Sequence, residues 1–172
     1  MSVVTEHLKQ QGSVFEVIPH RQVYTSIDEA RALGIDADEV LKPLAMRTGS
    51  GYALMVIPAS RRLDLQLARA AQADNQARLA TEDELGHDFA GYQLGALPPL
   101  GVLLGAKVYV DPEVLGHDMV AFAAGTQTES IRMRTQELFG GERASTVPLV
   151  RRPERTSDDP IASAGRVGDP PS

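Results

Sequence analysis

Residues 40–58 constrain the fold of this chain more than any other stretch, because they predict a β-hairpin. Two apolar runs, at 40–46 and 52–57, flank Thr48-Gly49-Ser50-Gly51, whose small residues are typical of a tight turn. Alternation along the first run places Lys42 in the middle of an otherwise apolar face. The sequence therefore predicts a hairpin whose first strand has one charged residue, Lys42, on an otherwise apolar face.

A lysine in this position has two interpretations. It either extends its ammonium group to the rim of the sheet, which is the more common outcome, or it sits half-enclosed against an anionic or carbonyl partner. Pro43 beside it has no N–H for a sheet ladder, so we expect an edge strand, a bulge or a strand end that faces a cleft. The residues themselves leave both interpretations of Lys42 open.

Composition excludes several classes of protein. The 172 residues are enough for one domain with one core, which should be aliphatic because Trp is absent and only 5% of residues are aromatic. Without cysteine there is no disulfide framework, thiolate nucleophile or cysteine-based zinc site, and we expect a cytoplasmic protein. No run of about 18 apolar residues predicts a membrane span, and we expect no membrane contact.

Charge limits contact with nucleic acid. A formal net charge of −6 argues against a broad electrostatic footprint, so any contact with RNA must be local or be made through a bound end.

Helix caps, periodicity and turn residues predict many short elements in irregular order. Helices are expected at 3–11, after Thr25, at 64–73, after Thr81, at 112–115 and at 136–139, and strands at 13–19, 40–46, 52–57, 77–79, 107–111, 119–124 and 130–134. This order lacks the strict alternation of a doubly wound sheet. We therefore expect a single α+β domain over residues 1–148, in which a mixed, strongly curved sheet of about six or seven short strands is flanked by short helices. From about Arg151 the sequence is polar and its charges cancel, and we expect a disordered tail at 149–172.

Familiar catalytic motifs are missing. The four histidines show no metal-ligand spacing, and there is no GxSxG, P-loop or dinucleotide fingerprint. The loop GALPPLG at 95–101 is stiffened by two prolines, and its glycines allow close backbone approach, so free N–H groups there could bind a carbonyl oxygen. An ordinary surface loop is the alternative, although surface loops are seldom so apolar.

The order of these features resembles the YbaK-like aminoacyl-tRNA deacylases, a family that includes the editing domain associated with prolyl-tRNA synthetase. The resemblance spans about residues 3–140 and is carried by His20 after the first strand, the Thr25 helix, Val40-Leu41-Lys42 before the hairpin, the Gly95 loop and the Ala124-Gly125 turn. It implies a YbaK-like fold for the domain.

The resemblance also implies roles for single residues. Lys42 matches the lysine of the pattern V-x-K-[ST]-L and would be catalytic, although Pro43 stands where the family usually has Ser or Thr. Gly95 to Pro99 match a Gly-x-x-x-Pro loop that holds the aminoacyl ester near the tRNA 3′ end. Substrate-binding residues would be His20, Thr25, Gly95, Pro98, Pro99, Gly101, Gly125 and Ser130, where His20 replaces a Tyr and Ser130 an Asp of some members.

The implied function is that of a trans-editing hydrolase that removes a mischarged small amino acid from tRNA, without a metal or other cofactor. Its partners would be the 3′ end of aminoacyl-tRNA and an aminoacyl-tRNA synthetase. The first alternative is a binding module of the same fold with weak or no turnover, which Pro43 and Ser130 motivate. The second is a lysine Schiff-base enzyme, since an enclosed lysine can have a lowered pKa.

Overall fold

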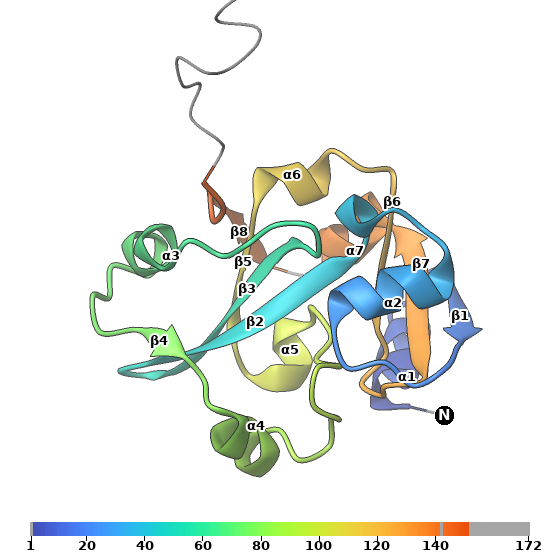
Figure 1. The fold of residues 1–172 in the computed structure, drawn as a ribbon, viewed down its shortest axis with the longest axis horizontal. Helices are drawn as coiled ribbons and strands as arrows, with labels where there is room; N and C mark the ends of the chain where they lie inside the picture. Colours follow the sequence, from blue (N-terminus) through green and yellow to red (C-terminus); the bar gives the residue numbers. More distant parts are fainter. Residues whose placement is uncertain (1, 142, 152–172) are drawn as a thin grey trace, which may run out of the picture.

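A computed structural model describes residues 2–141 and 143–151 of the chain, which form an α+β domain with two sheets (Figure 1). The larger sheet has the strand order β4-β2-β3-β5-β8 and the smaller one β1-β7-β6. In the larger sheet the strands are β2 (Leu41–Thr48), β3 (Gly51–Pro58), β4 (Arg78–Leu79), β5 (Lys107–Val110) and β8 (Ala144–Thr146). In the smaller sheet they are β1 (Phe15–Pro19), β6 (Met119–Ala123) and β7 (Glu129–Arg134).

The predicted fold class is confirmed, with a correction to the sheet. Instead of one curved sheet of six or seven strands, the described residues form eight strands divided between two sheets. The larger sheet is mixed, because β2 runs antiparallel to β3 and β4 whereas β5 runs parallel to β3 and β8. A parallel bridge between Val40 and Ala121 links the residue before β2 to β6, so the two sheets are in contact at this point.

The helices are short and surround the sheets. They are α1 (Val3–Gln10), α2 (Ser26–Leu33), α3 (Leu65–Gln72), α4 (Glu82–Asp88), α5 (Gly101–Leu104), α6 (Pro112–Leu115) and α7 (Thr135–Gly141), with a 3-10 turn, η1, at Ala37–Glu39. No helix in the described part of the chain is long and apolar enough to cross a membrane.

Local sequence signals account for most helix starts. Thr25 accepts the N–H of Asp28 at the start of α2, and Asp64 accepts two N–H groups at the start of α3. Thr81 and Glu84 form a capping box at α4, in which each side chain accepts a backbone N–H of the other residue. Because each cap satisfies N–H groups that a helix leaves unpaired, these helices begin where the sequence predicts.

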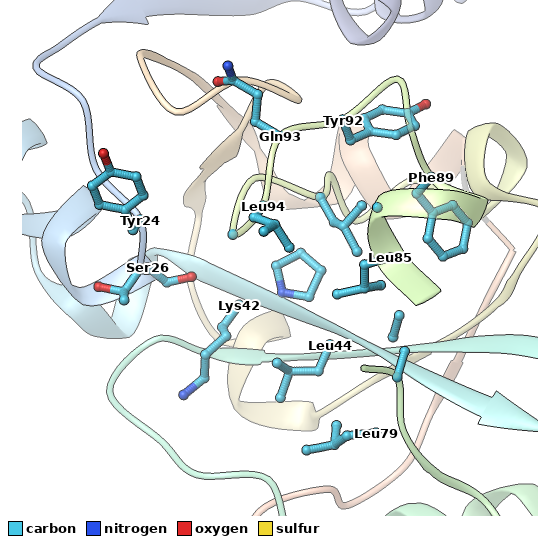
Figure 2. A pocket seen from close by; sticks show the side chains of 17 residues that line it. Tyr24, Ser26, Lys42, Leu44, Leu79, Leu85, Phe89, Tyr92, Gln93 and Leu94 are labelled. Atoms are coloured by element: carbon cyan, nitrogen blue, oxygen red, sulfur yellow. The ribbon is translucent and has the colours of Figure 1, made fainter. Parts of the chain in front are cut away.

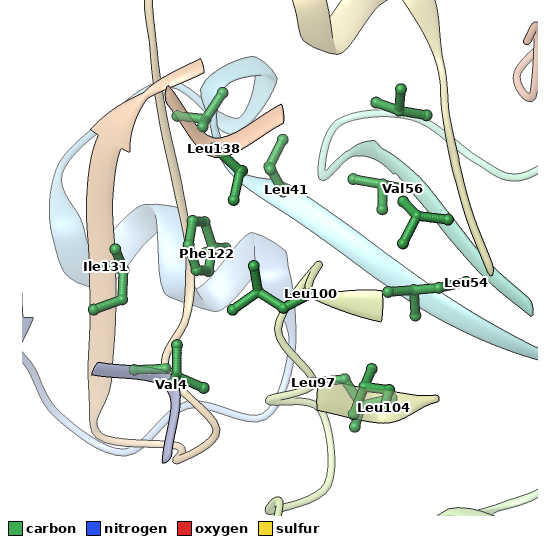
Figure 3. Close-up of a cluster of buried hydrophobic side chains, with 14 of the residues drawn as sticks. Val4, Leu41, Leu54, Val56, Leu97, Leu100, Leu104, Phe122, Ile131 and Leu138 are labelled. Carbon is green, nitrogen blue, oxygen red and sulfur yellow. The ribbon is translucent and has the colours of Figure 1, made fainter. Parts of the chain in front are cut away.

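The hairpin forms the centre of the core. Its strands β2 and β3 pair over their full length, with Lys42 opposite Ile57, and the turn lies at Gly49 and Ser50 as predicted. Both faces of β3 are buried: Leu54 and Val56 pack into one apolar cluster, whereas Met55 and Ile57 pack into a second. Figure 3 shows the first cluster, in which Leu41, Leu100, Phe122 and Ile131 pack in the space between the two sheets. The core is aliphatic, as the composition predicts.

The packed domain extends beyond the predicted boundary at residue 148. Leu149 and Val150, which the sequence assigns to the tail, are buried, and both donate their backbone N–H to the carboxylate of Asp111 (2.8 and 3.1 Å). Asp111 is itself 2% exposed and also caps α6. The rest of the expected disordered tail, residues 152–172, lies outside the described residues.

Candidate functional site

A pocket of about 310 Å³ opens beside the outer edge of β2 (Figure 2). Four segments line it: the start of α2, the middle of β2, the stretch from β4 through α4, and the loop that follows α4. The lining residues are Tyr24, Thr25, Ser26, Lys42, Pro43, Leu44, Ala45, Leu79, Ala80, Leu85, Gly86, Phe89, Tyr92, Gln93, Leu94, Gly95 and Leu97. Ala45, Phe89 and Leu97 are buried, so the interior is apolar, while the polar side chains lie toward the mouth. A pocket of this size and character is typical of small-molecule sites.

Lys42 takes the half-enclosed position rather than the free rim. Its Nζ donates a hydrogen bond to the carbonyl oxygen of Arg61 (2.7 Å), in the connection between β3 and α3. Burial lowers the pKa of Lys42 below its ordinary value, and the nearby charge of Arg62 lowers it further. Figure 2 shows the ammonium group pointing away from Leu85 and Leu94, so the alkyl stem lines the pocket and the charge sits at its mouth.

Pro43 lies at the free edge of β2, as its missing N–H predicts. The hydroxyl of Ser26 donates to the carbonyl of Leu41 (3.5 Å), and the N–H of Ala80 donates to the carbonyl of Ala45 (3.0 Å). These two carbonyls point away from β3, and alternation gives the carbonyl of Pro43 the same direction. Opposite Pro43, the carbonyl of Val56 accepts from Asp111 on the β5 side. The proline therefore costs the β2–β3 ladder no hydrogen bond.

Gly95 is required by close packing. Its φ is +76°, and a Cβ added there would lie 2.1 Å from the carbonyl oxygen of Tyr24. The loop around it is held from the β6–β7 turn, because Gln127 donates through its side chain to the carbonyl of Leu94 (2.9 Å) and through its backbone to the side chain of Gln93 (2.7 Å). The segment before α2 and the loop after α4 thus meet at one wall of the pocket.

Three of the predicted site residues line this pocket: Lys42, Thr25 and Gly95. Pro98 and Pro99 are buried just beyond the lining, and Gly101 begins α5. Gly125 lies under Tyr92, whose ring carbon would come within 3.1 Å of an added Cβ. His20 and Ser130 do not line the pocket but bond to each other, with 2.8 Å between Nε2 and Oγ.

Comparison with known proteins identifies the family. A family model described as the aminoacyl-tRNA editing domain matches residues 20–140, which is more than half of the chain. The chain belongs to the aminoacyl-tRNA editing domain family. The resemblance seen in the sequence is thereby confirmed.

Curated relatives of this editing domain are much longer proteins. Proline--tRNA ligases of Thermosipho melanesiensis and Fervidobacterium nodosum are 26% and 33% identical over 87 and 94 residues. These matches cover 51% and 55% of this chain but 15% and 16% of the ligases. The editing domain therefore spans about one-sixth of the length of the curated relatives it matches.

Solved structures share the fold of the editing domain. A scaffold used for computational epitope grafting has a TM-score of 0.76, with 87% of this chain and 96% of that chain covered. A hypothetical protein follows at 0.74, with coverage of 84% and 97%. A candidate trans-editing enzyme for prolyl tRNA synthetase reaches 0.69, with coverage of 86% and 98%. Each is 24% identical in sequence, which supports the fold alone.

On α2 lies a buried carboxyl group that sequence reasoning missed. Glu29 on α2 is 3% exposed and accepts a hydrogen bond from the hydroxyl of Ser130, which also contacts His20. Burial raises the pKa of Glu29 to about 7, and the bond from Ser130 opposes part of that rise. The available signal was its helix position, because Glu29 stands four residues before Leu33 and beside Ala30, inside the apolar stripe of α2.

Surface ion pairs and hydrogen bonds fix the α4 wall of the pocket. Arg78 on β4 contacts both carboxylate oxygens of Glu84 (2.7 and 3.2 Å), and this contact and the Thr81 bonds lower the pKa of Glu84 to about 2. Tyr52 of the hairpin donates to Asp88 at the end of α4. Sequence reasoning missed this wall, because Leu79, Leu85 and Phe89 carry no signal that separates pocket residues from core residues.

Metal ligands do not gather in the described part of the editing domain. Within residues 2–141 and 143–151, no three His, Asp or Glu side chains are placed so that they could hold a metal ion.

Proposed function

We propose that this editing domain is a trans-editing hydrolase that removes a mischarged amino acid from tRNA by cleaving the ester at the tRNA 3′ end. The observation that carries the proposal is the pocket itself. In a member of the aminoacyl-tRNA editing family, one wall supplies Lys42, another supplies the Gly95 loop, and the interior is apolar. Such a site suits an aminoacyl group, whose side chain enters while its ester stays at the mouth.

The chemistry asks little of the protein, because an aminoacyl ester is already labile. A water molecule attacks the ester carbonyl carbon, the bond from that carbon to the ribose oxygen breaks, and the ribose oxygen takes a proton. The released amino acid leaves as a carboxylate with loss of a proton. The protein has to position the ester and stabilise the negative charge that forms on its carbonyl oxygen.

Lys42 and the pocket mouth provide that stabilisation in the proposed mechanism. Its ammonium is held by one neutral carbonyl, that of Arg61, so it can transfer to a developing oxyanion without breaking an ion pair. The hydroxyls of Thr25 and Ser26 and the main chain near Gly95 are further donors at the mouth. A well-placed donor of this kind is worth about 3 kcal/mol in the transition state.

The proposed partner is the acceptor end of an aminoacyl-tRNA. The curated relatives are proline--tRNA ligases, and one structure of the same fold is a candidate trans-editing enzyme for prolyl tRNA synthetase. These relatives favour a tRNA that a prolyl-tRNA synthetase has mischarged, and association with that synthetase. A net charge of −6 restricts attraction for RNA to local cations, such as the exposed Arg62, whose charge acts on Lys42.

A panel of mischarged tRNAs tests the proposal. We expect at least one aminoacyl-tRNA to be hydrolysed well above the rate in buffer, Lys42→Ala to remove most of that activity, and EDTA to leave it unchanged. Lys9→Ala is the matched control, since Lys9 is exposed on α1 and does not line the pocket. If no tRNA in the panel is hydrolysed faster than in buffer, or if Lys42→Ala is as active as the parent, the proposed hydrolase is wrong.

A binding module without turnover is the second candidate, and Pro43 is the observation that favours it. Proline replaces the Ser or Thr expected next to the lysine, which removes both a hydroxyl group and an N–H from the pocket edge. This candidate predicts saturable binding of a non-hydrolysable aminoacyl-adenosine amide, together with background hydrolysis of every aminoacyl-tRNA tested. Rapid turnover of any one of them excludes it.

A further inference from the structure

The edge of β2 presents one main-chain acceptor to the pocket. Leu41, Pro43, Ala45 and Arg47 of β2 have carbonyls that point away from β3, and Arg47 pairs with Arg78 of β4. Nearer the pocket, the carbonyl of Leu41 is bonded by Ser26 and that of Ala45 by Ala80. The carbonyl of Pro43 lies between those of Leu41 and Ala45 and has no partner in the described part of the chain, and Pro43 lines the pocket. Any other residue would place an N–H on the same edge, because the N–H and C=O of one strand residue point to the same side. Proline leaves an acceptor and no donor.

Charge in the pocket matches this arrangement. Among the described residues that line the pocket, Lys42 has the only charged side chain, and no carboxylate is present. A ligand that carries a cationic group must therefore bind it through neutral oxygens. Lys42 would repel such a group, but its Nζ is turned toward the carbonyl of Arg61, away from the pocket interior. The carbonyl of Pro43 is the main-chain oxygen left for a cation to use at this edge.

We propose that the main-chain carbonyl of Pro43 binds the α-ammonium group of the aminoacyl substrate. This inference rests on the proposed function and specifies the substrate as an aminoacyl ester with a free α-amino group. The ammonium group donates to the Pro43 oxygen, the amino-acid side chain enters the apolar interior near Leu85 and Phe89, and the ester faces the mouth near Gly95. An N–H at position 43 would oppose this binding, since its positive end would face the ammonium group.

The same edge disfavours peptidyl substrates. A peptide that adds to a strand edge needs alternating donors and acceptors from that edge. Here the flanking carbonyls are already bonded, and Pro43 provides an acceptor but no donor. An N-acylated aminoacyl-tRNA also lacks the cation and brings a carbonyl that finds no N–H at this edge. The pocket should therefore distinguish a free amino group from an acylated one.

The test compares free and N-acetylated aminoacyl-tRNA with the parent protein, Pro43→Ala and Pro112→Ala. Pro43→Ala restores the N–H and keeps the carbonyl, whereas Pro112→Ala is a matched control on α6, away from the pocket lining. For the parent we expect kcat/KM to be at least about 10-fold higher for the free substrate, after correction for the rates in buffer. Pro43→Ala should reduce this ratio several-fold, chiefly through KM, and Pro112→Ala should leave it unchanged.

Binding of a non-hydrolysable probe separates this inference from the proposed function. A 3′-aminoacylamino-3′-deoxyadenosine and its N-acetyl derivative are titrated against the same three proteins, so that no turnover is needed. A preference for the free amine that Pro43→Ala weakens supports the inference even if hydrolysis is absent. Equal binding of the two probes by the parent, or a preference that is the same in Pro43→Ala, overturns it while leaving any observed hydrolysis in place. Melting temperatures of both variants control for misfolding.

Discussion

Replacement of Glu29 by Gln should remove a pH dependence from the stability of this domain. Because Glu29 is 3% exposed and burial raises its pKa to about 7, the folded state holds the proton more tightly than the unfolded chain, where the value is near 4.5. The resulting stabilisation is complete below pH 4.5 and is lost as the pH rises through about 7. A difference of about 2.5 pKa units corresponds to about 3 kcal/mol of unfolding free energy.

Urea unfolding between pH 4.5 and 8.5 measures this effect. We expect the difference in unfolding free energy between the parent and Glu29→Gln to shift by about 3 kcal/mol across the range, to the disadvantage of the parent at high pH. Gln keeps an oxygen that accepts from Ser130, so the hydrogen bond survives the substitution. Groups common to both proteins cancel in the difference, and Glu82→Gln, at an exposed position on α4, should show none. A difference that stays constant within about 1 kcal/mol, or that has the opposite slope, would refute the argument.

Three further predictions concern the pocket. Lys42→Met keeps the alkyl stem and removes the charge, so kcat/KM for aminoacyl-tRNA should fall at least about 100-fold while the melting temperature is retained. A fall in kcat/KM together with a lower melting temperature would indicate a structural role for Lys42 instead. Gly95→Ala should lower the unfolding free energy by about 2 kcal/mol or more, because φ is +76° and the new Cβ meets Tyr24, whereas Gly91→Ala, with nothing within 4 Å, should not. Arg62→Ala should weaken binding of aminoacyl-tRNA and reduce the slope of log K against log salt by about 1, and should leave hydrolysis of an aminoacyl-adenosine unchanged; an unchanged slope would show that Arg62 contacts no phosphate.

The free edge at Pro43 shows how far a local signal can reach. A residue without an N–H predicted an edge strand or a strand end facing a cleft, and β2 has a free edge at this point, beside the pocket. The local sequence could not decide between the two interpretations of Lys42, because the partner of its ammonium group is the carbonyl of Arg61, 19 residues away in the sequence. Alternation placed the side chain, but only the path of the β3–α3 connection decided which carbonyl it meets.

Elements without their own local signal were missed. The short strand β8 pairs with β5 at one end of the larger sheet, and α5 begins at a buried glycine in a stretch interpreted as a loop. Neither has a strong turn or a side-chain cap to mark it. The division of the strands between two sheets was missed for a related reason, since pairing of β1 with β7 joins residues more than 100 positions apart.

The sequence by itself determined the hairpin, the caps at Thr25, Asp64 and Thr81, the aliphatic core and the family, because each depends on residues a few positions apart or on their order along the chain. The tertiary structure decided what surrounds the pocket. It brought α4 against the edge of β2, left the carbonyl of Pro43 without a partner among residues 2–141 and 143–151, and buried Glu29 against Ser130, 101 residues away. Packing of distant segments fixes burial, and burial in turn fixes the pKa of a carboxyl group and the shape of a site.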